Sequence, residues 1–315
     1  WQQERRQHDM KGKMKLNQNS FLLLVTIILF FVMYGIGCVI FNAQGFSKTQ
    51  NFLNLFISNA GLIVIGIGMT VVMITGGIDI SVGSFVAMGC MMLAWMMEKG
   101  GVGAVPAVLI VLATGIIFGL VQGFLVAYMD IQPFIVTLAG MFFGRGMTSI
   151  ISTDMISIKN KTFLAWANYK IYLPIGSYSR RGKFIPAYIY PTVIIAILIF
   201  IVVLDGLLAG CGGFLFCLNS CSGFVEQAKG LEMDAISASV IGVTLLSGGV
   251  GTPFGTVFGV LIKGTISSLI TTQGTLSSWW VRIALSALLC FFIVLRALSC
   301  MTSVTCRCLF VFFLK

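Results

Sequence analysis

The chain has 315 residues, of which 58% are hydrophobic and only 10% are charged, and its mean hydropathy is +1.01. Soluble domains carry about 25% charged residues, so this composition excludes a soluble globular domain and predicts an integral membrane protein. The formal net charge of +10 comes mainly from an N-terminal tail and one loop. Cations beside a bilayer interact with anionic lipid, so we expect membrane lipid, and not nucleic acid, as their partner.

Ten apolar stretches follow one another along the chain, and about 20 apolar residues cross the hydrocarbon layer. The first stretch is longer than the apolar part of a signal peptide and no cleavage pattern follows it, so we expect an uncleaved helix. A polar loop at 153–186 divides the series. The expected spans are 20–41, 55–75, 82–97, 104–128, 133–152, 188–204, 206–219, 231–247, 254–272 and 280–298.

The expected fold is all-α, a polytopic protein with about eight to ten transmembrane helices in one domain, 20–298. We place the basic tail, 1–19, in the cytoplasm, because cations next to the first helix favour that side. The C-terminal tail, 299–315, is rich in cysteine and atypical for such a protein. We therefore expect a multi-pass protein of the cell (inner) membrane.

Two distant segments, 70–85 and 242–257, share one pattern at a constant offset of 172 residues. In each, an apolar run enters a Gly-rich break and a second apolar run leaves it. Six predicted helices separate the copies, an even number, so we expect two parallel internal repeats. Apolar segments broken at matching places in two halves indicate the working core of a membrane transporter.

We expect the two Gly-rich breaks to form a gate or to line a substrate pathway, because glycine lets a backbone bend and pack closely. With a cytoplasmic N-terminus, both breaks fall on the cytoplasmic side. The residues assigned to this role are Gly76, Gly77, Asp79, Ser81, Gly83, Gly248, Gly249 and Gly251.

Asp79, in the segment GGIDISVG, has two interpretations. In the first, Asp79 or Ser81 caps the helix that begins near Val82 by accepting hydrogen bonds from its free amides. In the second, Asp79 binds an ion or the substrate, because a carboxylate at membrane depth is costly and usually functional. Gly251 stands at the matching place in the second copy, so the carboxylate is not common to both repeats.

Other polar side chains also fall inside predicted spans. Asn59, Gln122 and Arg145 either line a pathway or form hydrogen bonds between helices, and the sequence does not choose between these roles. Lys263 and Arg282 are expected to be structural, with their long side chains reaching toward the membrane surface.

No residue pattern indicates catalysis. The single histidine, His8, lies in the tail, no phosphate-binding GxxxxGK[ST] motif occurs, and the nine cysteines are scattered without a CxxC pair. We therefore expect no enzyme, no metal site and no cofactor.

Three segments together identify a family: ITGGIDISVGS, LEMDAISASVIGVTLLSGGVGTPFGTVFGVLIKG and GTLSSWW. They resemble permease subunits of bacterial ABC sugar importers of the ribose/galactose/arabinose group, and within it are most similar to galactofuranose-transporter permeases. The resemblance covers roughly 55–152 and 231–298. The motif residues that match, besides the Gly-rich breaks, include Glu232 and Asp234.

The resemblance implies how such a subunit works and with which partners. Two permease subunits, identical or different, would form the pathway. A cytoplasmic ATP-binding subunit would power transport, and a periplasmic or lipid-anchored sugar-binding protein would deliver the monosaccharide.

The chain departs from this family near 204–206. Family members have a cytoplasmic segment there with a GGN…AA…G-like motif, which docks on the ATPase. Here FIVVL joins directly to DGLLAGCGGFLF, so the coupling loop is expected to be missing and ATP-coupled transport to be impaired. Besides an ABC permease, two alternatives stay open: an ion-coupled secondary carrier that uses Asp79, and a truncated, inactive permease.

Overall fold

A computed structural model describes residues 18–178, 184–194, 196, 205–224, 226, 228–274 and 279–301 of the chain. Most of the described structure is helical, as the apolar composition predicts. The helices are α2 (Gln18–Ile40), η2 (Asn42–Gln44), α3 (Thr49–Ile74), α4 (Val82–Glu98), α5 (Ala104–Tyr128), α6 (Pro133–Ile151), α7 (Lys161–Asn168), α9 (Asp205–Ser220), α10 (Leu231–Ile241), α11 (Pro253–Gln273) and α12 (Trp279–Met301).

Five of these helices, α2, α3, α5, α6 and α11, are long and apolar enough to cross a membrane, and α4, α9 and α12 contain shorter apolar stretches. This agrees with the expected polytopic helical fold. That the two halves are parallel repeats stays a prediction. Of the expected span 188–204, residues 195 and 197–204 lie outside the described residues, so the joint at 204–206 is described only from Asp205 onward; nearly all of both tails also lie outside.

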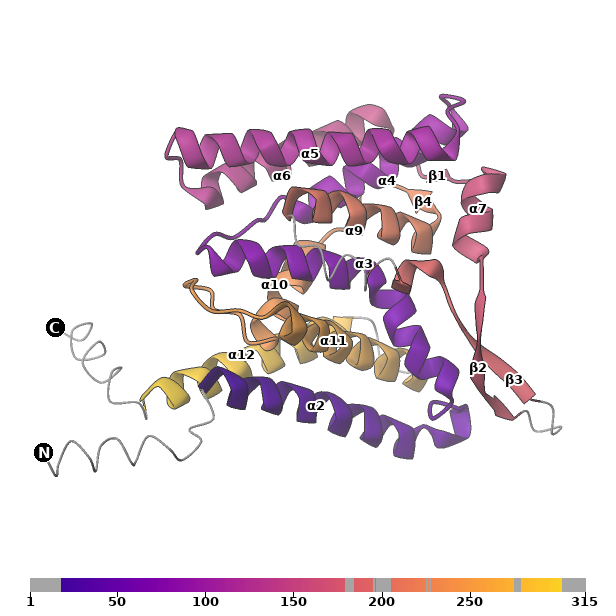
Figure 1. The fold of residues 1–315 in the computed structure, drawn as a ribbon, viewed down its shortest axis with the longest axis vertical. Coiled ribbons are helices and arrows are strands. Elements are labelled where there is room, and N and C mark those ends of the chain that lie inside the picture. Colours follow the sequence, from indigo (N-terminus) through magenta and orange to yellow (C-terminus); the bar gives the residue numbers. More distant parts are fainter. Residues whose placement is uncertain are drawn as a thin grey trace, which may run out of the picture.

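The long helices lie side by side in one bundle, with α5 and α6 at one edge and α2 and α12 at the other (Figure 1). The most apolar window of α3 is 72% buried inside the bundle, against 17% in α2 and 22% in α5. The exposed faces of these outer helices carry large apolar side chains such as Phe31, Leu120 and Phe124. Such faces suit lipid, so α3 is central and α2 and α5 are peripheral.

Close helix contacts depend on glycine, as small residues at helix interfaces predict. A Cβ on Gly61 of α3 would lie 3.2 Å from the Gly212 carbonyl oxygen of α9. A Cβ on Gly259 of α11 would overlap the Ala238 carbonyl oxygen of α10. These positions allow α9 and α11 to approach their neighbours at backbone distance.

The segment expected as a polar loop, 153–186, is partly folded. The strand β1 (Ile156–Ser157) pairs with β4 (Ser222–Gly223), and β2 (Ile171–Tyr178) pairs antiparallel with β3 (Phe184–Ile189). The β2–β3 hairpin contacts the start of α3. There Gln50 Oε1 accepts a hydrogen bond from the Tyr188 N–H at 2.9 Å, and Gln50 Nε2 donates to the Tyr188 carbonyl at 3.1 Å.

One end of the bundle holds both Gly-rich breaks, the start of α2 and the end of α12, at the left of Figure 1. The β2–β3 hairpin lies at the opposite end, at the right. The fold therefore places the start of α2 at the same end of the bundle as both breaks, and the side of the membrane on which this end lies stays a prediction.

Candidate functional site

The first break, residues 75–81 between α3 and α4, is a left-handed turn followed by an extended segment. α3 ends at Ile74, and Gly76 has a φ of +84°, a conformation that favours glycine. The Gly77 N–H reaches back to the Val72 carbonyl at 3.2 Å, which closes the helix end. The chain then runs through Ile78 and Asp79 to the start of α4 at Val82.

The second break is a longer loop between α10 and α11. α10 stops at Ile241, earlier than the expected 247, because the chain leaves helical geometry at Val243, whose φ is +75°. Gly242 packs directly on the backbone of Gly255. Gly248 and Gly249 have φ values of +84° and +83°. Thr252 then caps α11 by accepting a hydrogen bond from the Gly255 N–H at 3.2 Å, and Pro253 occupies the first helical position.

The two breaks touch each other through their backbones. The Gly249 N–H donates to the Ile74 carbonyl at 2.8 Å. A Cβ built on Gly248 would lie 2.8 Å from the Gly76 Cα, and one on Gly251 would lie 2.8 Å from Ile74 Cγ1. The two matching segments of the sequence therefore form one contact in space that side chains would push apart.

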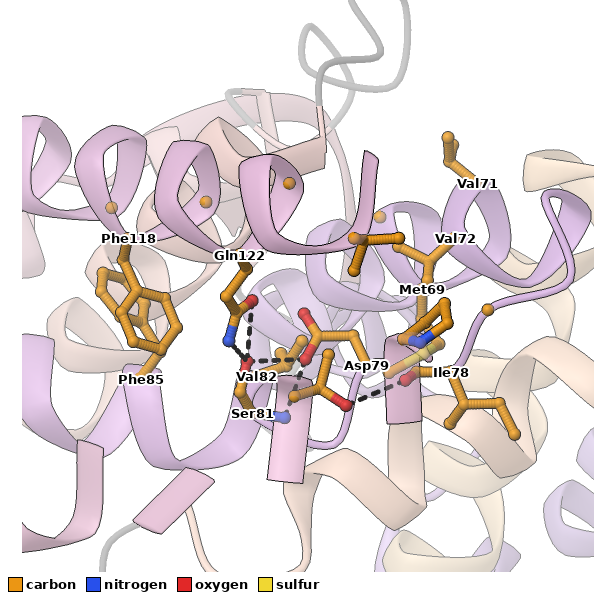
Figure 2. Close-up of a pocket in the computed structure, with 18 of the residues that line it drawn as sticks. Met69, Val71, Val72, Ile78, Asp79, Ser81, Val82, Phe85, Phe118 and Gln122 are labelled. Carbon is orange, nitrogen blue, oxygen red and sulfur yellow. Dashed lines mark hydrogen bonds between the residues drawn. The ribbon is translucent and has the colours of Figure 1, made fainter. Parts of the chain in front are cut away.

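Asp79 lies in a short chain of hydrogen bonds that joins the first break to α5 (Figure 2). Its Oδ1 accepts from the Ser81 N–H at 2.8 Å and from the Ser81 hydroxyl at 2.6 Å. Gln122 Nε2 of α5 donates to the same hydroxyl oxygen at 3.1 Å. Asp79 thus fixes Ser81, the residue that precedes α4. The Ser81 side chain itself makes no hydrogen bond to an amide of α4.

A cavity of about 630 Å³ opens beside this chain of hydrogen bonds. Its walls come from α3, the first break, α4, α5 and the start of α6, and most of its lining side chains are apolar. Phe85 and Phe118 stack with ring centroids 5.1 Å apart on one side (Figure 2). The Thr137 hydroxyl of α6 donates to the Ile78 carbonyl at 3.1 Å, which fixes the break against a third helix.

The predicted site residues therefore divide into groups. Gly77, Asp79, Ser81 and Gln122 line the cavity, whereas Asn59 and Arg145 do not. Asn59 lies nearer the other end of α3, where its amide donates to the Leu55 carbonyl at 2.8 Å. Arg145 lies near Glu226 in the α9–α10 loop. The pKa of Glu226 is lowered, chiefly by its hydrogen bond with Lys229 and to a smaller extent by the charge of Arg145.

Gly83 makes room for a buried carboxylate. Glu232, in the first turn of α10, is 8% exposed, and a Cβ on Gly83 would overlap its Oε2. That oxygen has no hydrogen-bond partner among the described residues. It lies beside the first turn of α4, where the helix dipole favours negative charge. The motif residue Glu232 therefore packs α10 against the helix that follows the first break.

Lys263 corrects one expectation from the sequence. It lies in the middle of α11, and its Nζ forms an ion pair with Asp234 Oδ2 of α10 at 3.0 Å. The cation therefore does not reach for the membrane surface. It is balanced inside the bundle by an acidic residue of the family motif.

Sequence reasoning missed a buried hydroxyl cluster near the breaks. Thr70 of α3 bonds to both Ser239 of α10 and Thr256 of α11, and Ser239 also donates to the Gly66 carbonyl at 3.2 Å. All three hydroxyl residues are fully buried. The offset that matches Ser84 to Thr256 was one available signal, but a partner on α3 is visible only in the fold.

The chemistry available at the site is binding and movement. Among the described residues, no three His, Cys, Asp or Glu side chains gather closely enough to hold a metal ion. The site offers a carboxylate, a hydroxyl and an amide beside an apolar cavity, together with two breaks held by backbone contact.

Comparisons with known proteins agree with this description. A family described as "Branched-chain amino acid transport system / permease component" matches residues 51–204. The inner membrane ABC transporter permease protein YjfF of Escherichia coli (strain K12) is 35% identical over 303 residues, covering 87% of this chain and 91% of the relative. No solved structure matches the chain.

Two further relatives are named by what they import. The fructose import permease protein FruG of Bifidobacterium longum (strain NCC 2705) is 27% identical and covers 91% of this chain and 93% of the relative. The autoinducer 2 import system permease protein LsrC of Yersinia pseudotuberculosis (serotype O:3, strain YPIII) is 27% identical, with 84% and 80% covered.

These relatives are named as transport permeases and not as enzymes. With five candidate spans, the chain is a multi-pass protein of the cell's inner membrane. A permease of this kind works with an ATP-binding partner and a substrate-binding partner. The family resemblance seen in the motifs is thus confirmed: the chain belongs to the family of permease subunits of ABC importers.

Proposed function

We propose that this chain is the membrane permease of an importer for a neutral monosaccharide and works by alternating access. The observation that supports the proposal is the direct contact of the two Gly-rich breaks, through Gly249 and Ile74, beside a cavity of about 630 Å³. Movement at this contact would change access to the cavity from the end of the bundle that holds both breaks, the cytoplasmic end in our assignment.

The breaks are suited to such movement because few side chains lie between them. Gly76 and Gly248 meet at backbone distance, so the contact can separate or slide without repacking large groups. The hydrogen bonds between Asp79 and Ser81 and between Gln122 and Ser81 connect the first break to α5, so a displacement of the break would also move α5. In this mechanism Asp79 has a positioning role.

The substrate class follows from the cavity and the relatives. Apolar walls with a few placed polar groups are typical of sites for small ligands, and a sugar presents both C–H faces and hydroxyls. FruG is named for fructose import and LsrC for autoinducer 2 import. The motifs favour a sugar of the galactofuranose, ribose or galactose type.

The partners in the proposal are a cytoplasmic ATP-binding subunit, a periplasmic or lipid-anchored sugar-binding protein and a second permease subunit, identical or different. We further propose that ATP coupling is impaired in this chain. The family match ends at residue 204. The alignment with YjfF has 303 positions, but this chain contributes only 87% of its 315 residues to it, about 274. About 29 positions of the alignment therefore have no counterpart anywhere in this chain, as a missing loop would require.

The test is reconstitution in proteoliposomes with an ATP-binding subunit and a sugar-binding protein, sought first among the products of the neighbouring genes. The proposal predicts a stable complex with the ATP-binding subunit and sugar uptake that requires ATP, at a low rate because coupling is impaired. Sugar accumulation by this subunit alone, driven by an ion gradient, would contradict the proposal and favour the carrier alternative.

The coupling proposal needs a second arm of the same experiment. A variant carries a loop taken from YjfF, inserted at 204–206, and its sugar-stimulated ATPase rate is compared with that of the unaltered chain. We expect a higher rate in the variant. Equal rates would show that the short joint does not limit coupling. Complex formation without uptake in either chain would support the inactive-permease alternative.

A further inference from the structure

A second hollow lies between α3 and α11, away from the cavity at the breaks. It has a volume of about 400 Å³, and nine of its eleven lining residues are polar. They comprise three asparagines of α3, five serines and threonines, and Lys263. Polar groups inside a membrane protein are costly and usually functional. A polar cleft in a chain with 10% charged residues therefore needs an explanation.

The cleft lies at the end of the bundle opposite the breaks. Its walls are the first turns of α3, from Asn51 to Asn59, and the second half of α11. Asn59 and Ile74 are 15 residues apart on α3, about 22 Å along the helix. The β2–β3 hairpin, fixed to Gln50 at the start of α3, stands beside this end (Figure 1). If the tail is cytoplasmic, the cleft is on the outer side.

The side chains of the cleft offer both hydrogen-bond acceptors and donors. Asn51 and Asn59 each donate one amide N–H to a backbone carbonyl at 2.8 Å. The hydroxyls of Thr271 and Thr272 donate to the carbonyls of the residues four positions earlier, at 2.8 and 2.7 Å. These bonds leave the oxygens of the four side chains as acceptors and the second N–H of each amide as a donor. A ligand hydroxyl can bond to either kind of group, because it both donates and accepts.

The charge of the cleft argues against an ionic ligand. Among the described residues that line it there is no carboxylate, and the ammonium of Lys263 repels cations. That ammonium is in turn paired with Asp234 at 3.0 Å, so its charge is largely balanced and does not demand an anion. A neutral polyhydroxylated molecule fits such a cleft, because its hydroxyls both donate and accept several hydrogen bonds.

We propose that the α3–α11 cleft is a binding site for a neutral sugar on the face of the permease opposite the breaks. The inference rests on the proposed function for its substrate class, but it adds a site that is distinct from the cavity at Asp79. A sugar would reach this cleft before the cavity, and the two sites lie at opposite ends of α3.

The experiment measures binding by the purified full-length chain in lipid nanodiscs, with no partner and no nucleotide. Saturation-transfer NMR is run with ribose, galactose, fructose and gluconate as probes. At least one of the three neutral sugars should bind, and T271V/T272V should bind it about tenfold more weakly, as two lost hydrogen bonds predict. Thr114→Val is the matched control, because this α5 hydroxyl also donates to a carbonyl four residues earlier, at 2.8 Å.

Equal binding by the wild-type chain and T271V/T272V would overturn the proposal, as would binding of gluconate alone or of no probe. A loss of binding in Thr114→Val equal to that in the double variant would overturn it too. All variants are first matched for thermal unfolding midpoint. Binding does not depend on ATP, so sugar bound in the cleft without ATP-driven uptake in proteoliposomes would count against the proposed function and leave the cleft assignment standing.

Discussion

The two Gly-rich breaks have similar backbones in different surroundings. The first break faces the cavity, and its Asp79 is joined through Ser81 to α5. The second has Gly251 at the matching position, packed against the Ile74 side chain. The two breaks share backbone geometry, whereas a carboxylate joined by hydrogen bonds to a neighbouring helix belongs to the first alone. Substitutions that disturb the backbone contact should therefore reduce uptake more than substitutions that remove the hydrogen bonds from Asp79 through Ser81 to Gln122.

The largest effect is expected from Gly248→Val. Its Cβ would lie 2.8 Å from the Gly76 Cα, at a φ of +84° that a branched residue rarely adopts. The backbone strain alone amounts to about 1–3 kcal/mol, and the breaks must also separate. We expect ATP-driven uptake to fall more than about tenfold, measured in proteoliposomes. Gly35→Val is the control, because no atom lies within 4 Å of that Cβ; equal uptake in both variants would refute the importance of the contact.

A smaller effect is expected from Asp79→Ala, which removes the acceptor for two Ser81 hydrogen bonds. Ser81 is 1% exposed, so its unpaired N–H costs about 1–3 kcal/mol and uptake should fall roughly tenfold. Asp79→Asn keeps an acceptor oxygen and should lose less than about threefold by the same reasoning. If Asn is as damaging as Ala, the charge itself is needed, and Asp79 is an ion or substrate ligand.

Gln122→Leu should have a milder effect, because it removes one hydrogen bond to Ser81 and leaves Asp79 in place. A single bond contributes about 0.5–1.5 kcal/mol, which corresponds to a severalfold loss of uptake. Gln273→Leu, at the exposed end of α11, serves as the control. Unchanged uptake in Gln122→Leu would show that α5 does not follow the first break.

The smallest effect is expected from Gly249→Ala. This residue also has a positive φ, +83°, but no atom lies within 4 Å of its Cβ. Only the strain of a left-handed alanine remains, about 1 kcal/mol, and the hydrogen bond to Ile74 is kept. Thermal unfolding in detergent should shift by a few degrees with uptake near wild type. A loss as large as that of Gly248→Val would mean that strain, and not the close approach to Gly76, controls the breaks.

Much of the fold could be predicted from the sequence because lipid imposes a simple rule of length and hydrophobicity. The ends of α5 and α6 follow directly from apolar runs bounded by Gly103, Gln132 and polar residues. α10 is shorter than its apolar run: Val243 takes a left-handed conformation directly after Gly242, which packs on Gly255 of α11. That contact is tertiary, and no local pattern reveals it.

The candidate site could be predicted only in part. The repeated glycines marked both breaks, but their mutual contact depends on how α3 and α10 pack. The polar residues of α3 recur at helical spacing, from Asn51 and Asn54 to Ser58, which was a usable signal for the cleft. The partner of Lys263 was not predictable, since Asp234 lies 29 positions away on another helix.

α3 has a mechanical consequence for the whole molecule. Its 26 residues extend about 39 Å along the helix axis, and the helix bends partway (Figure 1). At one end, Gln50 bonds to the hairpin backbone at Tyr188; at the other, the Ile74 carbonyl accepts the Gly249 N–H. A protein that docks on the hairpin and shifts this helix would thereby disturb the glycine contact on the far side, with no need for a ligand to travel between them.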